Sequence, residues 1–286
     1  MTDPLLAIVL GLFSAVTLAA ANMSVKMGTD ILVGRAILSS SAAMLILPGA
    51  FFVAPPDAAT WRALVIALPA HFFYQICLVR SMQRGDLSLV FPVMRGAAPL
   101  LTAFSALIFL GEELAPLAWA GLLCATAAVV AFALPPKGVR LRDHPDRTAL
   151  LWALGTAFGV SLYNVADARG VRIAPSPFTY IVWLFLLDGL AITTLAVAVR
   201  RNILAQAVAM KWRFGVAAGA LSILSFGSAL YAFSLMETAK VSALRETAVM
   251  FAAMMGTMFL GESFGRRRII AAIVLAAGLL LMQFAG

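Results

Sequence analysis

Ten apolar stretches follow one another along the chain and are separated by short polar gaps. They run approximately over residues 4–25, 31–53, 62–80, 86–110, 116–134, 148–167, 175–199, 213–236, 240–260 and 267–285. About 18–25 apolar residues are enough for a helix to cross a hydrocarbon core of about 30 Å. Barrel strands instead alternate in polarity over about ten residues. The sequence therefore predicts an all-α integral membrane protein with ten transmembrane helices.

Composition supports a membrane protein without a soluble domain. Hydrophobic residues make up 63% of the chain and charged residues 12%, whereas a soluble domain carries about 25% charged residues. The longest polar stretch, 135–147, is too short to fold by itself. The N-terminus lacks a basic segment, so the first stretch is expected to be a helix rather than a cleaved signal peptide. Cys77 and Cys124 lie in apolar stretches, which predicts buried thiols and no disulfide or metal site.

The basic residues gather at alternate junctions between the apolar stretches. By the positive-inside rule these junctions face the cytoplasm, which places both termini outside a multi-pass protein of the cytoplasmic (inner) membrane. The net charge of +8 is thus explained by topology, and no nucleic-acid partner is expected. The clustered residues are Lys26, Arg35, Arg80, Arg84, Lys137, Arg140, Arg142, Arg147, Arg200, Arg201, Lys211, Arg213, Arg266, Arg267 and Arg268.

The tetrapeptide FLGE occurs twice, at Phe109–Glu112 and at Phe259–Glu262, and Arg95 and Arg245 are related by the same offset. This duplication predicts a first five-helix repeat over 1–136, a basic linker over 137–147 and a second repeat over 148–286. An odd number of helices in each repeat inverts the second relative to the first. Inverted repeats are typical of transporters, with the binding site near the bilayer midplane between the repeats.

These features resemble the EamA-type repeat of the drug/metabolite transporter superfamily. The resemblance rests on the ten-helix frame, the two LGE tripeptides, Pro92 and Pro99, and the Gly/Ala-rich helix that ends each half. Within the superfamily the chain is similar to the YddG-type exporters of aromatic and other neutral amino acids. The resemblance implies a secondary transporter that exports amino acids or similar small metabolites by alternating access. Val249 stands opposite Pro99, so the fourth and ninth helices need not bend alike.

Charged groups inside the apolar stretches are the first candidates for a site. A charge at the bilayer centre costs roughly 2.5–3.5 kcal/mol on insertion scales, so such groups face a partner or a cavity. Arg95 and Arg245 are expected to bind a substrate carboxylate through their planar guanidinium groups. The alternative is an ion pair with Glu246 or Asp188 that holds helices together. Those two acids are in turn candidates for proton coupling.

Polar and aromatic residues supply further substrate-binding candidates. His71, Tyr74 and Gln75 share one face of the 62–80 stretch, where they can bond a substrate or join helices. The remaining candidates lie in the sixth, seventh and eighth stretches, where close helix packing is the alternative for the serine. They are Tyr163, Asn164, Trp183, Ser225 and Tyr231.

Glu112 and Glu262 are expected to cap the N-terminus of the helix that follows each of them. Small residues dominate 116–134 and 267–285, which predicts packing between the halves or between two chains. The sequence is therefore compatible with a monomer as well as with a dimer.

Other function classes are disfavoured by what the chain lacks. No phosphate-binding P-loop is present, so ATP is not expected to drive transport directly. The only histidines are His71 and His144, which do not suggest an enzyme, a metal site or a cofactor. The expected partners are a small-molecule substrate and the lipid bilayer. The alternative function is a multidrug or lipophilic-cation exporter, which would need accessible acids and neutralised arginines.

Overall fold

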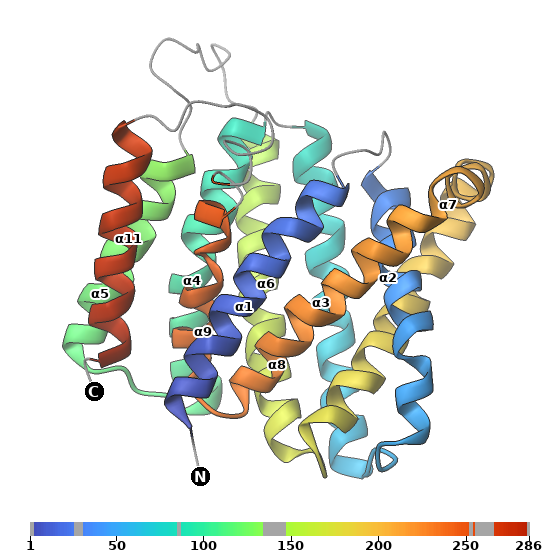
Figure 1. Cartoon of the computed structure of the whole chain (residues 1–286), viewed down its shortest axis with the longest axis horizontal. Helices are drawn as coiled ribbons and strands as arrows, with labels where there is room; N and C mark the ends of the chain where they lie inside the picture. Colours follow the sequence, from blue (N-terminus) through green and yellow to red (C-terminus); the bar gives the residue numbers. More distant parts are fainter. Residues whose placement is uncertain are drawn as a thin grey trace. The chain divides into compact units, whose positions relative to one another are not determined.

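The computed structural model describes residues 3–25, 31–84, 87–133, 147–251, 254 and 266–284. All regular elements assigned in this part of the chain are helices, which confirms the all-α prediction (Figure 1). The elements are α1 (Pro4–Val25), α2 (Ile31–Ile46), the 3₁₀ helix η1 (Leu47–Phe51), α3 (Ala58–Arg84), α4 (Leu87–Leu110), α5 (Pro116–Ala133), α6 (Arg147–Ile173), α7 (Pro177–Ser222), the π-helix η2 (Ile223–Gly227), α8 (Ser228–Phe233), α9 (Thr238–Arg245) and α11 (Arg266–Phe284).

Seven helical segments among the described residues are long and apolar enough to cross a membrane. Two shorter apolar helices, Pro116–Ala131 and Ile269–Phe284, accompany them. The expected stretch 240–260 lies partly outside the described residues, as do the linker and the second FLGE copy. The length and apolar composition of these helices indicate a multi-pass membrane protein, while ten transmembrane helices remain a prediction.

The chain divides into two compact units that do not coincide with the halves of the sequence. Unit 1 contains Met1–Phe72 and Ala166–Met236, and unit 2 contains Phe73–Val165 and Glu237–Gly286. Each unit therefore combines segments from both halves, and the boundaries fall inside α3 and α6. The compact units are a different division of the chain from the sequence repeats. The predicted repeats, 1–136 and 148–286, therefore remain a prediction.

In unit 1, α2 packs closely on two separate parts of α7. A Cβ atom at Gly189 would lie 2.7 Å from the Ser39 carbonyl oxygen, and one at Gly219 would lie 2.7 Å from the Ala42 nitrogen. Real Cβ atoms do not approach backbone atoms so closely, so glycine is required at both positions. Small residues thus let the two backbones meet, as is usual where helices associate in membranes.

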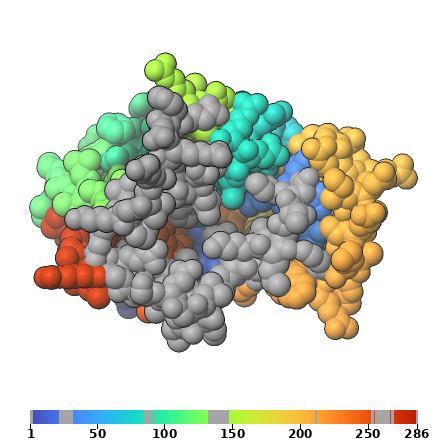
Figure 2. All heavy atoms as spheres, turned by 90° about the horizontal axis from the view of Figure 1, so that it is seen from above, coloured from blue at the N-terminus to red at the C-terminus, as the bar shows by residue number. Residues whose placement is uncertain are grey.

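The predicted stretches 175–199 and 213–236 are joined by a helical junction. Two candidate membrane spans, Pro177–Met210 and Trp212–Phe233, lie in this region, in agreement with the two stretches. α7 continues as one helix through Arg200, Arg201 and Arg213, and it turns near the upper right of Figure 1. No glycine or proline lies between residues 190 and 214 to end the helix. The three arginine side chains are exposed, and Figure 2 shows the middle of α7, in yellow-orange, at the surface. Their charges therefore need no break in the helix.

In unit 2, α5 and α11 lie side by side (Figure 1). A Cβ atom at Gly121 would lie 2.6 Å from the Gly278 carbonyl oxygen, and one at Gly278 would lie 2.8 Å from the Gly121 oxygen. Leu122, Leu275 and Met282 are fully buried in the same cluster. These contacts confirm that the two small-residue helices pack, and they do so between the two halves of one chain.

The first FLGE copy forms a link between α4 and α9 within unit 2. Gly111 has a φ of 68°, a left-handed conformation that favours glycine, and it ends α4. Glu112 then accepts hydrogen bonds from the Thr238 backbone N–H at 2.7 Å and from the Thr238 hydroxyl at 2.9 Å. These two bonds join Glu112 to α9, and its predicted role at the start of the helix directly after it stays a prediction. Glu112 satisfies a donor in the first turn of α9, where a carboxylate is favoured by the helix dipole. Glu262 lies outside the described residues.

Asp57 caps the N-terminus of α3, and the stability that this cap provides depends on pH. Its carboxylate accepts hydrogen bonds from the Thr60 hydroxyl at 2.7 Å and the Thr60 N–H at 2.8 Å, and these bonds lower the pKa of Asp57 below its usual value of 3.8. A lowered folded-state pKa adds stability above the unfolded pKa that is lost as pH falls through the folded pKa. We expect the Tm difference between wild type and Asp57→Ala, measured in detergent, to be constant above about pH 5 and to shrink below about pH 4.

The matched control is Asp57→Asn, which keeps a capping side chain that does not titrate. Its Tm difference from Asp57→Ala should not change over the same pH range. A wild-type difference that also stays constant would show that the Asp57 charge contributes nothing to the cap.

Candidate functional site

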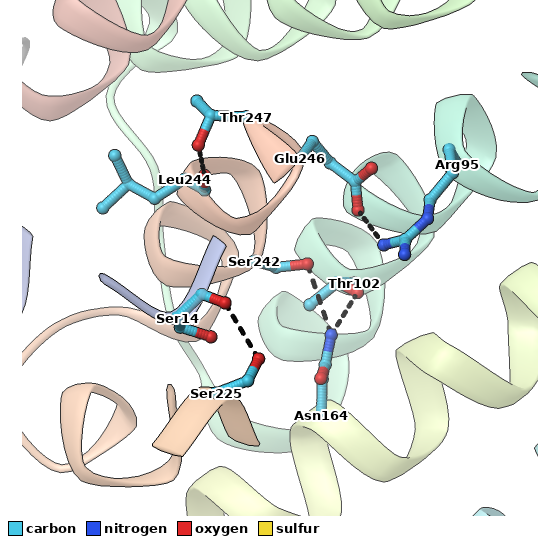
Figure 3. Close-up of polar contacts among 9 residues, drawn as sticks. All are labelled: Ser14, Arg95, Thr102, Asn164, Ser225, Ser242, Leu244, Glu246 and Thr247. Carbon is cyan, nitrogen blue, oxygen red and sulfur yellow. Dashed lines mark hydrogen bonds and ion pairs between the residues drawn. The ribbon is translucent and has the colours of Figure 1, made fainter. Parts of the chain in front are cut away.

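Unit 2 contains a buried ion pair between Arg95 of α4 and Glu246, the residue that follows α9. Arg95 Nη1 lies 3.4 Å from Glu246 Oε1 (Figure 3). The Glu246 side chain is only 5% exposed, whereas that of Arg95 is 24% exposed. The other carboxylate oxygen, Glu246 Oε2, is buried and accepts no hydrogen bond from the described residues. Of the two interpretations of Arg95 from the sequence, the structure has the ion pair, and the described residues leave one carboxylate oxygen beside it without a hydrogen bond.

A break in the helix positions Glu246. α9 ends at Arg245, and Glu246 and Thr247 form a turn before helix resumes. The Glu246 and Thr247 N–H groups bond to carbonyls three residues earlier, and the Thr247 hydroxyl donates to the Leu244 carbonyl at 2.7 Å (Figure 3). Buried Arg245 acts electrostatically on the Glu246 carboxylate. Interrupted helices within membranes are found where backbone lines a protein interior or a cavity, often at ion and substrate sites.

Asn164 of α6 joins α4 and α9 in the same unit. Its Nδ2 donates to the Thr102 hydroxyl at 3.3 Å and to the Ser242 hydroxyl at 3.2 Å (Figure 3). Its Oδ1 is buried and makes no hydrogen bond with the described residues. The nitrogen and oxygen of an amide are assigned from the bonding network, and hydroxyls can also donate, so the reversed amide is chemically equivalent here. In either orientation one polar atom of Asn164 makes no hydrogen bond within the described part of the chain.

Two tyrosines stand beside Arg95. The rings of Tyr74 and Tyr163 meet edge to face with centroids 5.2 Å apart, and both residues interact electrostatically with Arg95. Gln75, the neighbour of Tyr74 on α3, is buried. The backbones of α3 and α6 approach closely here, because a Cβ atom at Gly159 would lie 2.9 Å from Tyr74 Cα. The structure thus brings Arg95, Tyr74 and Tyr163 together next to an acid.

Unit 1 contains a separate buried network centred on Asp167 of α6. Asp167 Oδ2 lies 2.8 Å from His71 Nε2, and Asp167 Oδ1 accepts a hydrogen bond from the Tyr180 hydroxyl at 2.8 Å. Asp167 and Tyr180 are fully buried, and His71 is nearly so. His71 thus contacts an acid on another helix, while its association with Tyr74 and Gln75 as one binding patch stays a prediction.

The other candidates of unit 1 occupy varied positions. Trp183 meets Trp61 edge to face at 5.3 Å, and its Nε1 is buried without a hydrogen-bond acceptor among the described residues. Ser225 is buried in η2 and donates to the Ser14 carbonyl at 2.8 Å, which uses its hydroxyl structurally. Tyr231 stacks on the exposed ring of Phe178 at 5.4 Å. Asp188 is half-buried on α7 and acts electrostatically on His71.

Four polar residues of these networks were not among the predicted site residues: Thr102, Ser242, Asp167 and Tyr180. Asp167 carried a usable signal, because Tyr163, Asn164 and Asp167 fall on neighbouring positions of one helical face. Thr102 and Ser242 carried none, since a single hydroxyl in a membrane helix can bond its own backbone. Their roles depend on which helices meet.

Comparison with known proteins supports the resemblance in part. No curated protein matches the sequence. A solved crystal structure of a protein aligns over 96% of this chain and 94% of the other with a TM-score of 0.77 and 17% sequence identity, which shows a shared fold. Residues 147–284 match the model of the EamA-like transporter family. This match supports the relation to the drug/metabolite transporter superfamily and implies a membrane transporter of small substrates.

Proposed function

We propose that the protein is a secondary transporter that exports amino acids or similar small metabolites across the cytoplasmic membrane by alternating access. The observation that carries the proposal is the Arg95–Glu246 pair, buried between membrane helices beside an interrupted helix. Buried charges in membrane helices mark substrate and ion pathways by default. The EamA-like match of residues 147–284 is consistent with this assignment.

The chemistry of the pair suits a zwitterion. A substrate carboxylate can form a bidentate bond with the Arg95 guanidinium, and a substrate ammonium can donate to Glu246 Oε2, which has no donor among the described residues. At 3.4 Å the ion pair is longer than an optimal charged hydrogen bond. A zwitterionic substrate that binds between Arg95 and Glu246 therefore replaces only a weak contact. The rings of Tyr74 and Tyr163 offer an apolar surface for the substrate side chain.

A second candidate is export of lipophilic cations. It is favoured by one observation: Arg95 is already neutralised by Glu246, and Glu246 Oε2 remains as an acceptor. A cation needs only the carboxylate, whereas a zwitterion needs both members of the pair. Substitution of each member separately therefore distinguishes the two functions.

The test is counterflow into proteoliposomes that contain the full chain, with L-phenylalanine, L-alanine and tetraphenylphosphonium as probes. We expect amino acid exchange, reduced about 10- to 100-fold by Arg95→Gln and by Glu246→Gln because each removes a charge-assisted bond. Arg169→Gln, at an exposed arginine, is the control and should exchange normally. If only tetraphenylphosphonium exchanges and Arg95→Gln is harmless, the cation exporter is correct. If Arg95→Gln leaves amino acid exchange intact, the carboxylate site lies elsewhere.

A further inference from the structure

The network of His71, Asp167 and Tyr180 is a cluster of ionisable groups that the proposed substrate site does not use. It joins three helices of unit 1, since His71 lies on α3, Asp167 on α6 and Tyr180 on α7. Both oxygens of Asp167 are engaged, each at 2.8 Å from its partner. The Tyr180 ring packs directly on α6, because a Cβ atom at Gly170 would overlap the Tyr180 Cε2 atom. The three groups are therefore held in fixed geometry away from solvent.

This network has two charge states that differ by one proton. In the first, the Asp167 carboxylate accepts hydrogen bonds from the Tyr180 hydroxyl and from the Nε2–H of a neutral imidazole, and the cluster carries one negative charge. In the second, a proton binds Nδ1 of His71 and forms an imidazolium that neutralises the carboxylate. Since a net charge is costly to bury among membrane helices, the protonated state is favoured while the cluster is closed to water, and release of the proton requires water or a compensating charge.

Other charged groups reach the same histidine from the helices around it. Asp188 of α7 and Arg35 of α2 both act on His71 electrostatically, with opposite signs. Asp167, Asp188 and Arg35, from α6, α7 and α2, therefore all act on His71, and Tyr180 is linked to it through Asp167. A movement of any of these helices alters the field at His71. Proton binding and helix movement in unit 1 are therefore linked.

The histidine also contacts a helix segment with irregular backbone. The Phe226 ring meets the His71 ring edge to face at 5.6 Å, and Phe226 in turn meets Phe185 at 6.2 Å. Phe226 lies in η2, the π-helix between α7 and α8. π-helical turns occur frequently at functional sites, and an imidazolium interacts with an aromatic ring differently from a neutral imidazole. A change in the charge of His71 therefore alters its contact with Phe226 in η2, the one π-helical segment described in the chain.

We propose that His71, Asp167 and Tyr180 form a proton-binding site that couples transport to the proton gradient across the membrane. The proposal rests on the function proposed above, and it assigns His71 to the coupling ion instead of the substrate. One proton binds His71 Nδ1 in one conformation and leaves it in another. Asp188, a coupling candidate from the sequence, then acts as an electrostatic neighbour of the site. Glu246 remains with the substrate.

A first experiment measures proton binding without a substrate. The chain has two histidines, so the His144→Gln variant leaves His71 as the only one. With ¹⁵N-labelled histidine in liposomes, we expect the His71 ring signals to change reversibly between about pH 5 and 8. In the same background, Asp167→Asn should move the midpoint of this change. A His71 ring that keeps one protonation state throughout the range would overturn the proposal, whatever the protein transports.

A second experiment measures coupling. Uptake of L-phenylalanine and L-alanine into proteoliposomes with the full chain is measured in two assays. In the first, counterflow drives uptake without a pH gradient. In the second, an imposed pH gradient drives it. We expect the ratio of gradient-driven uptake to counterflow to fall at least about fivefold in Asp167→Asn and in His71→Gln. His144→Gln should keep the wild-type ratio. A network that only holds helices together would reduce both assays in parallel, and that result would refute coupling.

The outcomes separate this inference from the function on which it rests. If wild-type protein exchanges none of the probes, the amino acid function fails while the histidine titration still decides the proton site. If the wild-type protein exchanges amino acids but an imposed pH gradient does not change its uptake, the proposed transport function is supported and the proposed coupling site is refuted. Tyr180→Phe, which removes only the hydroxyl, should alter the midpoint of the His71 titration less than Asp167→Asn does.

Discussion

Replacement of Arg95 with leucine is expected to lower the free energy of unfolding by about 3 kcal/mol, because it leaves a buried carboxylate without its partner. The side chain of Glu246 is 5% exposed, and Oε2 already lacks a hydrogen bond with the described residues. Glu246→Leu should cost less, since Arg95 keeps 24% of its surface exposed and can be partly solvated. Unfolding by SDS titration in detergent micelles measures both values.

The double variant Arg95→Leu/Glu246→Leu is the control for this asymmetry. Removing both charges eliminates the unpaired ion, so its stability should lie within about 1 kcal/mol of wild type. Arg84→Leu, at an exposed position at the end of α3, should change stability by no more than about 0.5 kcal/mol. A double variant as unstable as Arg95→Leu would mean that the loss comes from packing and not from charge. A stable double variant that no longer exchanges substrate would assign the pair to function.

Gly121→Ala should destabilise the protein by about 2–3 kcal/mol even though alanine is the better helix former. The added Cβ would lie 2.6 Å from both the Gly278 carbonyl oxygen and the Met282 nitrogen. Backbone atoms inside a hydrogen-bonded helix cannot yield, so α5 and α11 must separate along the cluster of Leu122, Leu275 and Met282. Apparent Tm in detergent and SDS titration report the loss.

A matched glycine supplies the control for this substitution. A Cβ atom at Gly227 would meet only Ile181 Cγ2 at 3.7 Å, an ordinary contact. Gly227→Ala should therefore be neutral or stabilising by up to about 1 kcal/mol. Gly121→Ala and Gly278→Ala act on one contact, so the double variant should lose less than the sum of the single losses. Equal effects of Gly121→Ala and Gly227→Ala would contradict a close approach of α5 and α11.

The helical stretches could be predicted from the sequence because apolar length alone distinguishes them. α1, α4 and α5 begin and end close to the expected residues. The junction between the stretches 175–199 and 213–236 is helical, because arginine is a good helix former and no glycine or proline intervenes near Arg200, Arg201 and Arg213. Whether a helix continues depends on the backbone conformation of its residues. Charged side chains indicate only that a segment contacts water.

Pairings between distant segments could not be predicted in the same way. The sequence offered Glu246 and Asp188 as partners for an arginine, and Glu246 was correct for Arg95, although Arg245 is its neighbour in the chain. The partner of His71 lies 96 residues away, and that of Glu112 lies 126 residues away. Local spacing determines the face of a helix on which a polar group lies. Which other helix meets that face depends on packing of the whole bundle, as the contact of Gly121 with Gly278 illustrates.

The interleaving of the two units constrains biosynthesis. When the ribosome has completed residue 136, α2 still lacks its packing surface on α7, and α5 still lacks α11. Unit 1 cannot close until Met236 has been made, and unit 2 must wait for the C-terminal helix. The small-residue faces of α2 and α5 therefore lack their partner helices in the bilayer until the later helices are inserted. A nascent chain that stalls midway contains neither unit, and membrane quality control would encounter it as unassembled helices.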